Sequence, residues 1–109
     1  MDINILGTNY KIYFKTEKEE PALAELGGFC DETSKRIVVY DMVHSQSDMC
    51  SVSDKKYVQD LVLRHELIHA FLIESGLLDE SDWAANEEMV DYFARQFHKI
   101  EAVFNKLKI

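Results

Sequence analysis

Two histidines and a glutamate carry the clearest chemistry in the sequence. They stand as His65-Glu66-Leu67-Ile68-His69, which is the pattern H-E-x-x-H. Residues four apart on a helix lie on one face, with Cβ atoms about 5–6 Å apart. His65 and His69 can therefore hold one zinc ion, at about 2.0–2.1 Å from each ring nitrogen. Glu66 lies one step further round the helix and can act as general base on a metal-bound water, so the motif predicts a metal-dependent hydrolase.

The residues around the motif favour a functional site over two surface histidines on an ordinary helix. A surface helix would carry polar residues on most sides, whereas a helix buried around a catalytic metal would not. Six of the positions that surround or fill the motif are uncharged, namely Val62, Leu63, Leu67, Ile68, Ala70 and Phe71.

A second acidic motif, about twenty residues further on, offers a third ligand. Catalytic zinc usually takes three protein ligands and leaves a position for water. Glu87 and Asp91 are four apart, so one can bind the metal while the other hydrogen-bonds a ligating imidazole. Glu88 points about 100° away and is a weaker candidate. Two antiparallel helices joined by a short loop would bring Glu87 alongside His69.

The remaining histidines and cysteines are expected to lie outside the site. His98 is eleven residues past Glu87, about 16 Å further along the helix at 1.5 Å per residue, and is expected on the surface. His44 falls in the serine-rich segment Val43–Ser53, which predicts a loop; it could lie near the site, but a position in solvent is the favoured expectation. Cys30 and Cys50 have no C-x-x-C spacing, and we expect reduced packing residues rather than a disulfide or metal site.

Composition favours one globular domain over residues 1–109. The chain is 47% hydrophobic and 29% charged, with a net charge of −8. It lacks the basic face that a nucleic-acid-binding protein needs. No apolar run reaches the length of about 18 residues that a membrane helix requires. The first residues do not resemble a signal peptide, so we expect a cytoplasmic protein with neither nucleic acid nor membrane as partner.

Four short β-rich runs precede the motif. Ile3–Leu6 and Tyr10–Lys15 are separated by Gly7-Thr8-Asn9, which predicts a hairpin. A short helix is expected over Pro21–Leu26. Phe29-Cys30 and Arg36–Asp41 flank a polar turn and predict a second hairpin, in which the apolar run Ile37–Tyr40 indicates burial on both faces.

Two long helices are expected to follow the strands. The first begins at Ser53 or Asp54 and ends near Ser75, with Gly76 as its C-terminal stop. The second runs from Asp82 to about Lys106. Its apolar positions are spaced by three or four, which predicts a core-facing stripe of Met89, Phe93, Phe97, Ile100, Phe104 and Leu107. The predicted fold class is α+β, with a small antiparallel-rich sheet packed on the two helices.

These motifs resemble the gluzincin metallopeptidases, in which H-E-x-x-H is followed by N-E-x-x-x-D, here Asn86 to Asp91. The segment Glu87–Ala94 also resembles the E-x-x-A-[ND]-x-F-A motif of the ImmA/IrrE family, small gluzincin-like peptidases common in phages and mobile elements. The chain departs from that family at Ile68, where Gly is usual, and at Val90, where Ala is usual. The motif also resembles that of SprT-like proteases, but the downstream histidine ligand of those proteases has no counterpart here. Metzincins are excluded because their motif requires Gly at the position of Leu72.

The resemblance implies a minimal zincin-like domain, encoded by a phage or mobile element. It implies that His65, His69 and Glu87 bind zinc, that Asp91 supports His65, and that Glu66 takes a proton from a zinc-bound water. It also implies an edge strand to which an extended substrate adds by β-pairing. We expect Arg36–Asp41 to be that strand. The polar candidates for stabilising the oxyanion are His44, Tyr40, Tyr57 and Tyr92.

The sequence therefore predicts a zinc-dependent metallopeptidase that hydrolyses peptide bonds of a protein or peptide substrate. The alternative is a catalytically silent zincin-fold regulatory protein that binds a host or repressor protein. Retention of Glu66 favours the enzyme, because a binding protein has no need of the base. A structural zinc module fits poorly, because structural sites usually close with four protein ligands, often cysteines. The oligomeric state is left open.

Overall fold

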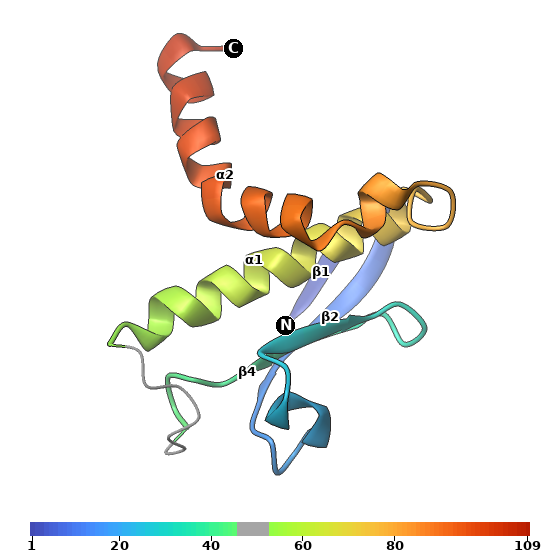
Figure 1. Ribbon diagram of the computed structural model, residues 1–109, viewed down its shortest axis with the longest axis vertical. Coiled ribbons are helices and arrows are strands. Elements are labelled where there is room, and N and C mark those ends of the chain that lie inside the picture. Colours follow the sequence, from blue (N-terminus) through green and yellow to red (C-terminus); the bar gives the residue numbers. More distant parts are fainter. Residues whose placement is uncertain (46–52) are drawn as a thin grey trace.

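The protein has an α+β fold in which a four-stranded mixed sheet precedes two long helices (Figure 1). The computed structural model describes residues 1–45 and 53–109. The expected loop over Val43–Ser53, with Cys50, therefore lies largely outside the described residues. In chain order the elements are β1 (Asp2–Ile5), β2 (Thr8–Lys15), the 3-10 helix η1 (Pro21–Ala24), β3 (Gly28–Asp31), β4 (Arg36–Tyr40), α1 (Lys55–Glu74), the 3-10 helix η2 (Asp82–Ala85) and α2 (Glu87–Leu107).

The two predicted hairpins are present, and they join through a parallel pair. β1 pairs antiparallel with β2, β2 pairs parallel with β4, and β4 pairs antiparallel with β3. The first turn is tighter than expected, because Thr8 and Asn9 already belong to β2. Leu6 and Gly7 both have positive φ, 49° and 94°, which suits the twist of a two-residue hairpin loop. Asn4 fixes this turn by accepting a hydrogen bond from the Gly7 amide at 3.0 Å.

β4 is an inner strand, so one sequence prediction is right and another is wrong. Its residues Ile37, Val38 and Val39 have no exposed surface, as the continuous apolar run predicted. The prediction that Arg36–Asp41 offers a free edge to a substrate is wrong, because β2 and β3 occupy both sides of β4. The outer strands of the described sheet are β1 and β3.

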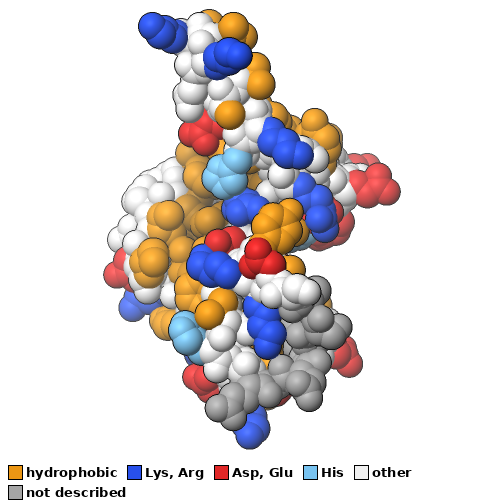
Figure 2. Space-filling model, turned by 90° about the vertical axis from the view of Figure 1, so that its left-hand side faces the viewer, with side chains coloured by type: hydrophobic (Ala, Val, Ile, Leu, Met, Phe, Trp, Pro, Cys, Tyr) orange, Lys and Arg blue, Asp and Glu red, His pale blue; other side chains and the backbone are white. Residues whose placement is uncertain are grey.

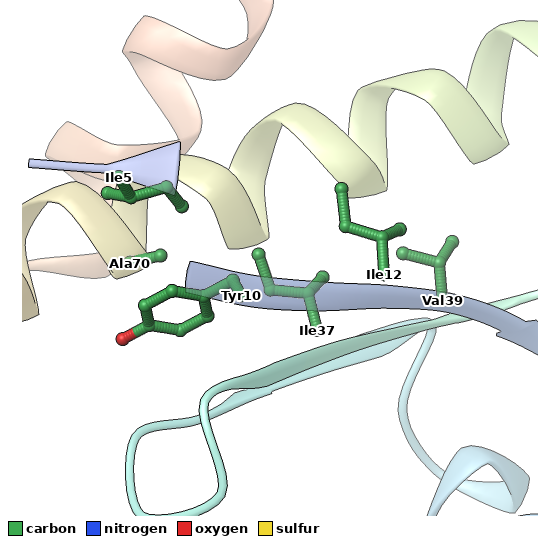
Figure 3. Packing of buried hydrophobic residues seen from close by; sticks show 6 residues of the cluster. All are labelled: Ile5, Tyr10, Ile12, Ile37, Val39 and Ala70. Atoms are coloured by element: carbon green, nitrogen blue, oxygen red, sulfur yellow. The ribbon is translucent and has the colours of Figure 1, made fainter. Parts of the chain in front are cut away.

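Helix α1 covers one face of the sheet, and its ends lie where the sequence placed them. The Asp54 carboxylate caps its start by accepting a hydrogen bond from the Tyr57 amide at 3.0 Å. Gly76 follows its end with φ of 79°, the left-handed conformation typical of a helix stop. Ala70 is fully buried and packs among the sheet residues of the main core, Ile5, Tyr10, Ile12, Ile37 and Val39 (Figure 3). The core thus lies directly beneath the helical turn that carries the motif.

The second helix differs from its prediction at its start. A single α-helix was expected from Asp82, but the chain forms η2 first and α2 begins only at Glu87. The Asn86 side chain accepts a hydrogen bond from the Met89 amide at 2.8 Å and so caps α2. Glu87 therefore stands in the first turn of α2. Helix α2 packs against α1 rather than against the sheet (Figure 1).

The apolar stripe of α2 is core only in part, contrary to prediction. Val90 and Ala94 are buried against α1, but beyond them the helix projects away from the rest of the molecule (Figure 1). We call Phe97–Leu107 the outer half of α2. Phe97, Phe104 and Leu107 in it are 51%, 49% and 61% exposed. Figure 2 shows hydrophobic side chains on the surface of this projecting part. Apolar spacing identifies one face of a helix but not what covers it.

The remaining sequence expectations concern single residues and short segments. The helix expected over Pro21–Leu26 is the shorter η1. The side chains of His44 and His98 are 82% and 70% exposed, as predicted. No helix among the described residues is long and apolar enough to cross a membrane.

Candidate metal centre

One turn of α1 presents His65 and His69 side by side. Their Nε2 atoms lie 3.1 Å apart, and their ring centroids are 4.8 Å apart in an edge-on arrangement. The two side chains are 21% and 18% exposed, so both are largely enclosed by protein. Two ring nitrogens can face each other at this distance only if they share a proton or a cation.

Glu87 approaches the same point from the first turn of α2. Its Oε2 lies 3.0 Å from Nε2 of His65 and 3.2 Å from Nε2 of His69. These three residues are the one group of potential ligands that converge within the described parts of the chain. The short η2 segment and the Asn86 cap bring Glu87 back over the motif, as the antiparallel helix arrangement predicted.

The three converging atoms fit a divalent cation. A tetrahedral ion with ligands at about 2.0–2.1 Å requires its ligand atoms to lie about 3.3 Å apart. The separations between the atoms of His65, His69 and Glu87 are 3.0–3.2 Å, close to that value. Two imidazole nitrogens and one carboxylate oxygen also form a donor set that leaves a fourth position for water or substrate. The residues present are therefore suited to a metal ion.

Glu66 lies beside these ligands on the side of α1 that faces the sheet. Its side chain lines the same cavity as His65, His69 and Glu87, and the residue is only 8% exposed. Burial raises the pKa of Glu66 to about 7, His65 partly offsets this, and Glu87 adds to it. A carboxyl group with a pKa near neutrality can both accept and donate a proton, as a general base must. A cation bound next to it would favour its charged form.

Gly28 lets β3 pass close to Glu66. A Cβ atom at Gly28 would lie 2.8 Å from Cγ1 of Val62, 3.0 Å from the carbonyl oxygen of Val38 and 3.4 Å from Cγ of Glu66. Carbon atoms normally meet at about 3.5–4.0 Å, so a side chain at this position would push β3 and α1 apart. The sequence alone could not show this close approach, because it depends on the position of β3 in the sheet.

Asp91 stands behind His65, on the side away from the converging atoms. Its Oδ1 lies 3.7 Å from Nδ1 of His65, and its Oδ2 accepts a hydrogen bond from Nε of Arg95 at 2.8 Å. Arg95, and to a smaller extent His65, hold the pKa of Asp91 below its usual range. The carboxylate is therefore ionised at neutral pH and faces the ring nitrogen that is not directed at Glu87.

A cavity of about 610 Å³ surrounds the candidate ligands. Cys30 lies in its wall, and burial together with Glu66 raises the pKa of the thiol to about 12. Cys30 is free and uncharged, in keeping with the packing role expected for it. β3 and the connecting segments contribute further residues to the wall, most of them apolar. These are Leu26, Gly28, Phe29, Glu32, Leu78 and Ala85.

The four polar candidates for stabilising an oxyanion do not line this cavity in the described structure. The Tyr40 hydroxyl is hydrogen-bonded to Ser45 at 2.9 Å. Tyr57 and Tyr92 are 54% and 55% exposed on their helices, and His44 pairs with Asp41. None of the four side chains therefore belongs to the wall of the candidate site in the described structure.

Comparison with protein-family models, with curated proteins and with solved structures finds no match for this chain. The case for a function therefore rests on the residues of the site itself.

Proposed function

We propose that the protein is a zinc-dependent metallopeptidase of the gluzincin kind, built on a minimal zincin-like fold. The observation that carries the proposal is the convergence of His65, His69 and Glu87 at 3.0–3.2 Å beside the buried Glu66. A three-ligand site of nitrogen and oxygen donors is typical of catalytic zinc rather than of structural zinc. In support of it, Glu66, the three candidate ligands and the cavity of about 610 Å³ lie together on one side of α1.

Each residue has a distinct role in this proposal. His65, His69 and Glu87 hold the ion, and Asp91 orients the His65 ring through Nδ1. When bound, zinc would supply Lewis-acid polarisation of a peptide carbonyl and would acidify water. Glu66 takes a proton from the attacking water and returns it to the leaving amine, for which a pKa near 7 is well matched.

The substrate would lie along β3 rather than along β4. β3 is an outer strand, and its residues Gly28, Phe29 and Cys30 line the cavity that contains the candidate ligands. A polypeptide that pairs with this edge in extended form would pass directly beside His65 and His69. The corrected strand order thus keeps the β-pairing hypothesis and moves it to another strand.

A catalytically silent regulatory protein is the second candidate. The exposed apolar side chains of the outer half of α2 support it, because apolar surface of this kind often marks a protein-binding site. The burial of Glu66 weighs against it. A carboxyl group kept out of water costs stability, and a binding protein gains nothing from that cost.

Metal content tests the proposal directly. We expect about one zinc per chain in the purified wild-type protein by inductively coupled plasma mass spectrometry. Glu87→Ala should retain much less zinc, whereas Glu88→Ala, which removes an exposed carboxylate one position away, should retain the wild-type amount. A wild-type protein that stays free of zinc after dialysis against zinc would overturn the proposed function.

A further inference from the structure

We propose that Arg95 is a positioning residue of the metal centre, which acts on His65 through the carboxylate of Asp91. The inference rests on the proposed function, in which His65 is a zinc ligand. Without Arg95, the Asp91 carboxylate can turn toward solvent, and His65 then binds the ion less tightly.

Asp91 divides its two oxygens between two partners. Oδ2 accepts the hydrogen bond from Nε of Arg95 at 2.8 Å, while Oδ1 faces Nδ1 of His65 at 3.7 Å. The second distance exceeds a direct hydrogen bond by about 0.5 Å, so a small movement of either side chain would close it. The Asp91 side chain is 44% exposed. Its partners, rather than burial, hold the carboxylate toward His65.

The Arg95 side chain lies on the metal side of α2. Asp91 and Arg95 line a hollow of about 280 Å³, together with Gly28, His65 and Glu66. The hollow is next to the larger cavity, since these last three residues line both. An arginine whose side chain pointed only into solvent would not line a hollow together with His65 and Glu66.

The backbone next to Arg95 is hydrogen-bonded to α1 at the residue next to His65. Nε of Arg64 donates a hydrogen bond to the carbonyl oxygen of Ala94 at 2.8 Å. Arg64 directly precedes His65, and Ala94 directly precedes Arg95. The bond therefore sets the distance between the His65 ring and the turn of α2 that carries Arg95. A fixed backbone allows one guanidinium hydrogen bond to determine the direction of the Asp91 carboxylate.

An ordinary surface pair is the simpler explanation. Asp91 and Arg95 are four residues apart on a helix, and pairs of this kind are common and contribute little to stability. A pair of that type would leave metal binding unchanged when it is broken. The two explanations therefore differ in an effect on metal affinity, not in an effect on folding.

The experiment is a double-mutant cycle in zinc affinity. The zinc dissociation constant is measured by competition with a chromophoric chelator for the wild type, Arg95→Ala, Asp91→Ala and the double variant. Loss of Asp91 should weaken binding about 10- to 100-fold, and loss of Arg95 about three- to tenfold. In the Asp91→Ala background, Arg95→Ala should have an effect of less than about twofold, because the residue through which it acts is gone.

Two further variants separate positioning from general effects of charge and folding. Lys99→Ala removes another exposed cation one turn further along α2 and should leave zinc affinity unchanged. Arg95→Lys keeps a cationic donor within reach of Asp91 and should restore most of the lost affinity. Thermal unfolding of the zinc-free variants, followed by circular dichroism, should show similar midpoints, because Arg95 is half exposed.

Three outcomes would contradict the inference. Unchanged affinity in Arg95→Ala would assign Arg95 to an ordinary surface pair. Equal losses from Arg95→Ala with and without Asp91 would mean that Arg95 acts by another route. Failure of the wild-type protein itself to bind zinc would overturn the proposed function and this inference with it, and that result is distinguishable from the other two.

Discussion

The three candidate ligands differ in how firmly the fold holds them. His65 and His69 are about four-fifths enclosed and project from a helical turn that rests on the core. The Glu87 side chain is 69% exposed and has more rotatable bonds, so it loses more conformational freedom when an ion fixes it. We infer that the histidines define the position of the ion and that Glu87 closes on it.

Replacement of Glu66 by Gln should slow hydrolysis strongly and leave zinc in place. The amide is similar in size to the carboxyl group but cannot accept the proton, so we expect a rate loss of about 10²- to 10⁴-fold. Hydrolysis is followed with a quenched fluorescent casein, and zinc content is measured on the same samples. Unchanged hydrolysis by the zinc-loaded variant would show that Glu66 is not the base. The binding protein would be favoured if neither the wild type nor Glu66→Gln hydrolysed the substrate and both had the same biological effect.

Replacement of Gly28 by Ala should destabilise the fold because β3 and α1 have no room for the methyl group. The new Cβ would lie 2.8 Å from Val62 and 3.0 Å from the Val38 carbonyl oxygen, and overpacking of this kind costs about 1–3 kcal/mol. Gly27→Ala is the matched control, because its Cβ would come no closer than 3.4 Å to Val62. Its free energy of unfolding should change by less than about 0.5 kcal/mol. Equal effects in urea unfolding would contradict this reading of Gly28.

At the scale of elements, α1 joins the sheet at both its middle and its end. Leu63 and Leu67 pack against the core residues of the sheet in the middle of α1, and Ala70, next to His69, is buried among them one turn before the helix ends. At the end, the Glu74 carboxylate accepts hydrogen bonds from Thr8 and Tyr10 in β2 at 2.8 and 2.7 Å, and from Lys35 in the turn before β4 at 2.7 Å. These contacts set the angle of α1 across the sheet and so the direction in which the motif faces.

The Glu74 contacts should make the stability of the fold depend on pH in acid. Lys35, Tyr10 and Thr8 lower the pKa of Glu74 from its ordinary 4.5 to about 2. Because the folded-state pKa is the lower one, the ionised carboxylate stabilises the fold above about pH 4.5, and this contribution is lost as the pH falls toward 2. Glu74→Gln should therefore be less stable than the wild type at pH 6, and the difference should shrink between pH 4.5 and 2.

Thermal unfolding midpoints measured from pH 6 to pH 2 test this prediction. Glu88→Gln is the control, since Glu88 is an exposed carboxylate on the first turn of α2. A Glu74→Gln protein whose midpoint falls as steeply with acid as that of the wild type would assign the acid sensitivity to other carboxylates.

The sequence predicted where the helices and strands lie along the chain better than it predicted which of them lie side by side. Asp54 and Gly76 gave the limits of α1 to within a residue, because capping depends on local chemistry that sequence carries. The meeting of His65, His69 and Glu87 also followed from helical spacing and a short connection. The order of the strands did not follow, because a strand buried on both faces can lie at several places in a sheet. β4 was therefore predicted to be an edge strand, whereas β3 is the outer strand on that side of the sheet.

At the scale of the whole molecule, the outer half of α2 departs from a compact shape. The radius of gyration is 14.9 Å, whereas a compact chain of this length has about 13 Å. The apolar spacing of Phe97, Phe104 and Leu107 indicated a buried face, since such a stripe usually rests on a neighbouring element. In the described structure α1 covers only the part of α2 that contains Val90 and Ala94.

Substitutions along α2 should therefore differ in cost according to position. Val90→Ala removes two buried methyl groups and should lower the free energy of unfolding by about 2 kcal/mol. Phe104→Ser changes a half-exposed side chain and should lower it by less than about 1 kcal/mol, although the side chain is larger. Urea unfolding at two protein concentrations measures both. Two results together would mean that another chain covers the outer half of α2 in solution. Phe104→Ser would cost as much unfolding free energy as Val90→Ala, and this cost would be larger at the higher protein concentration.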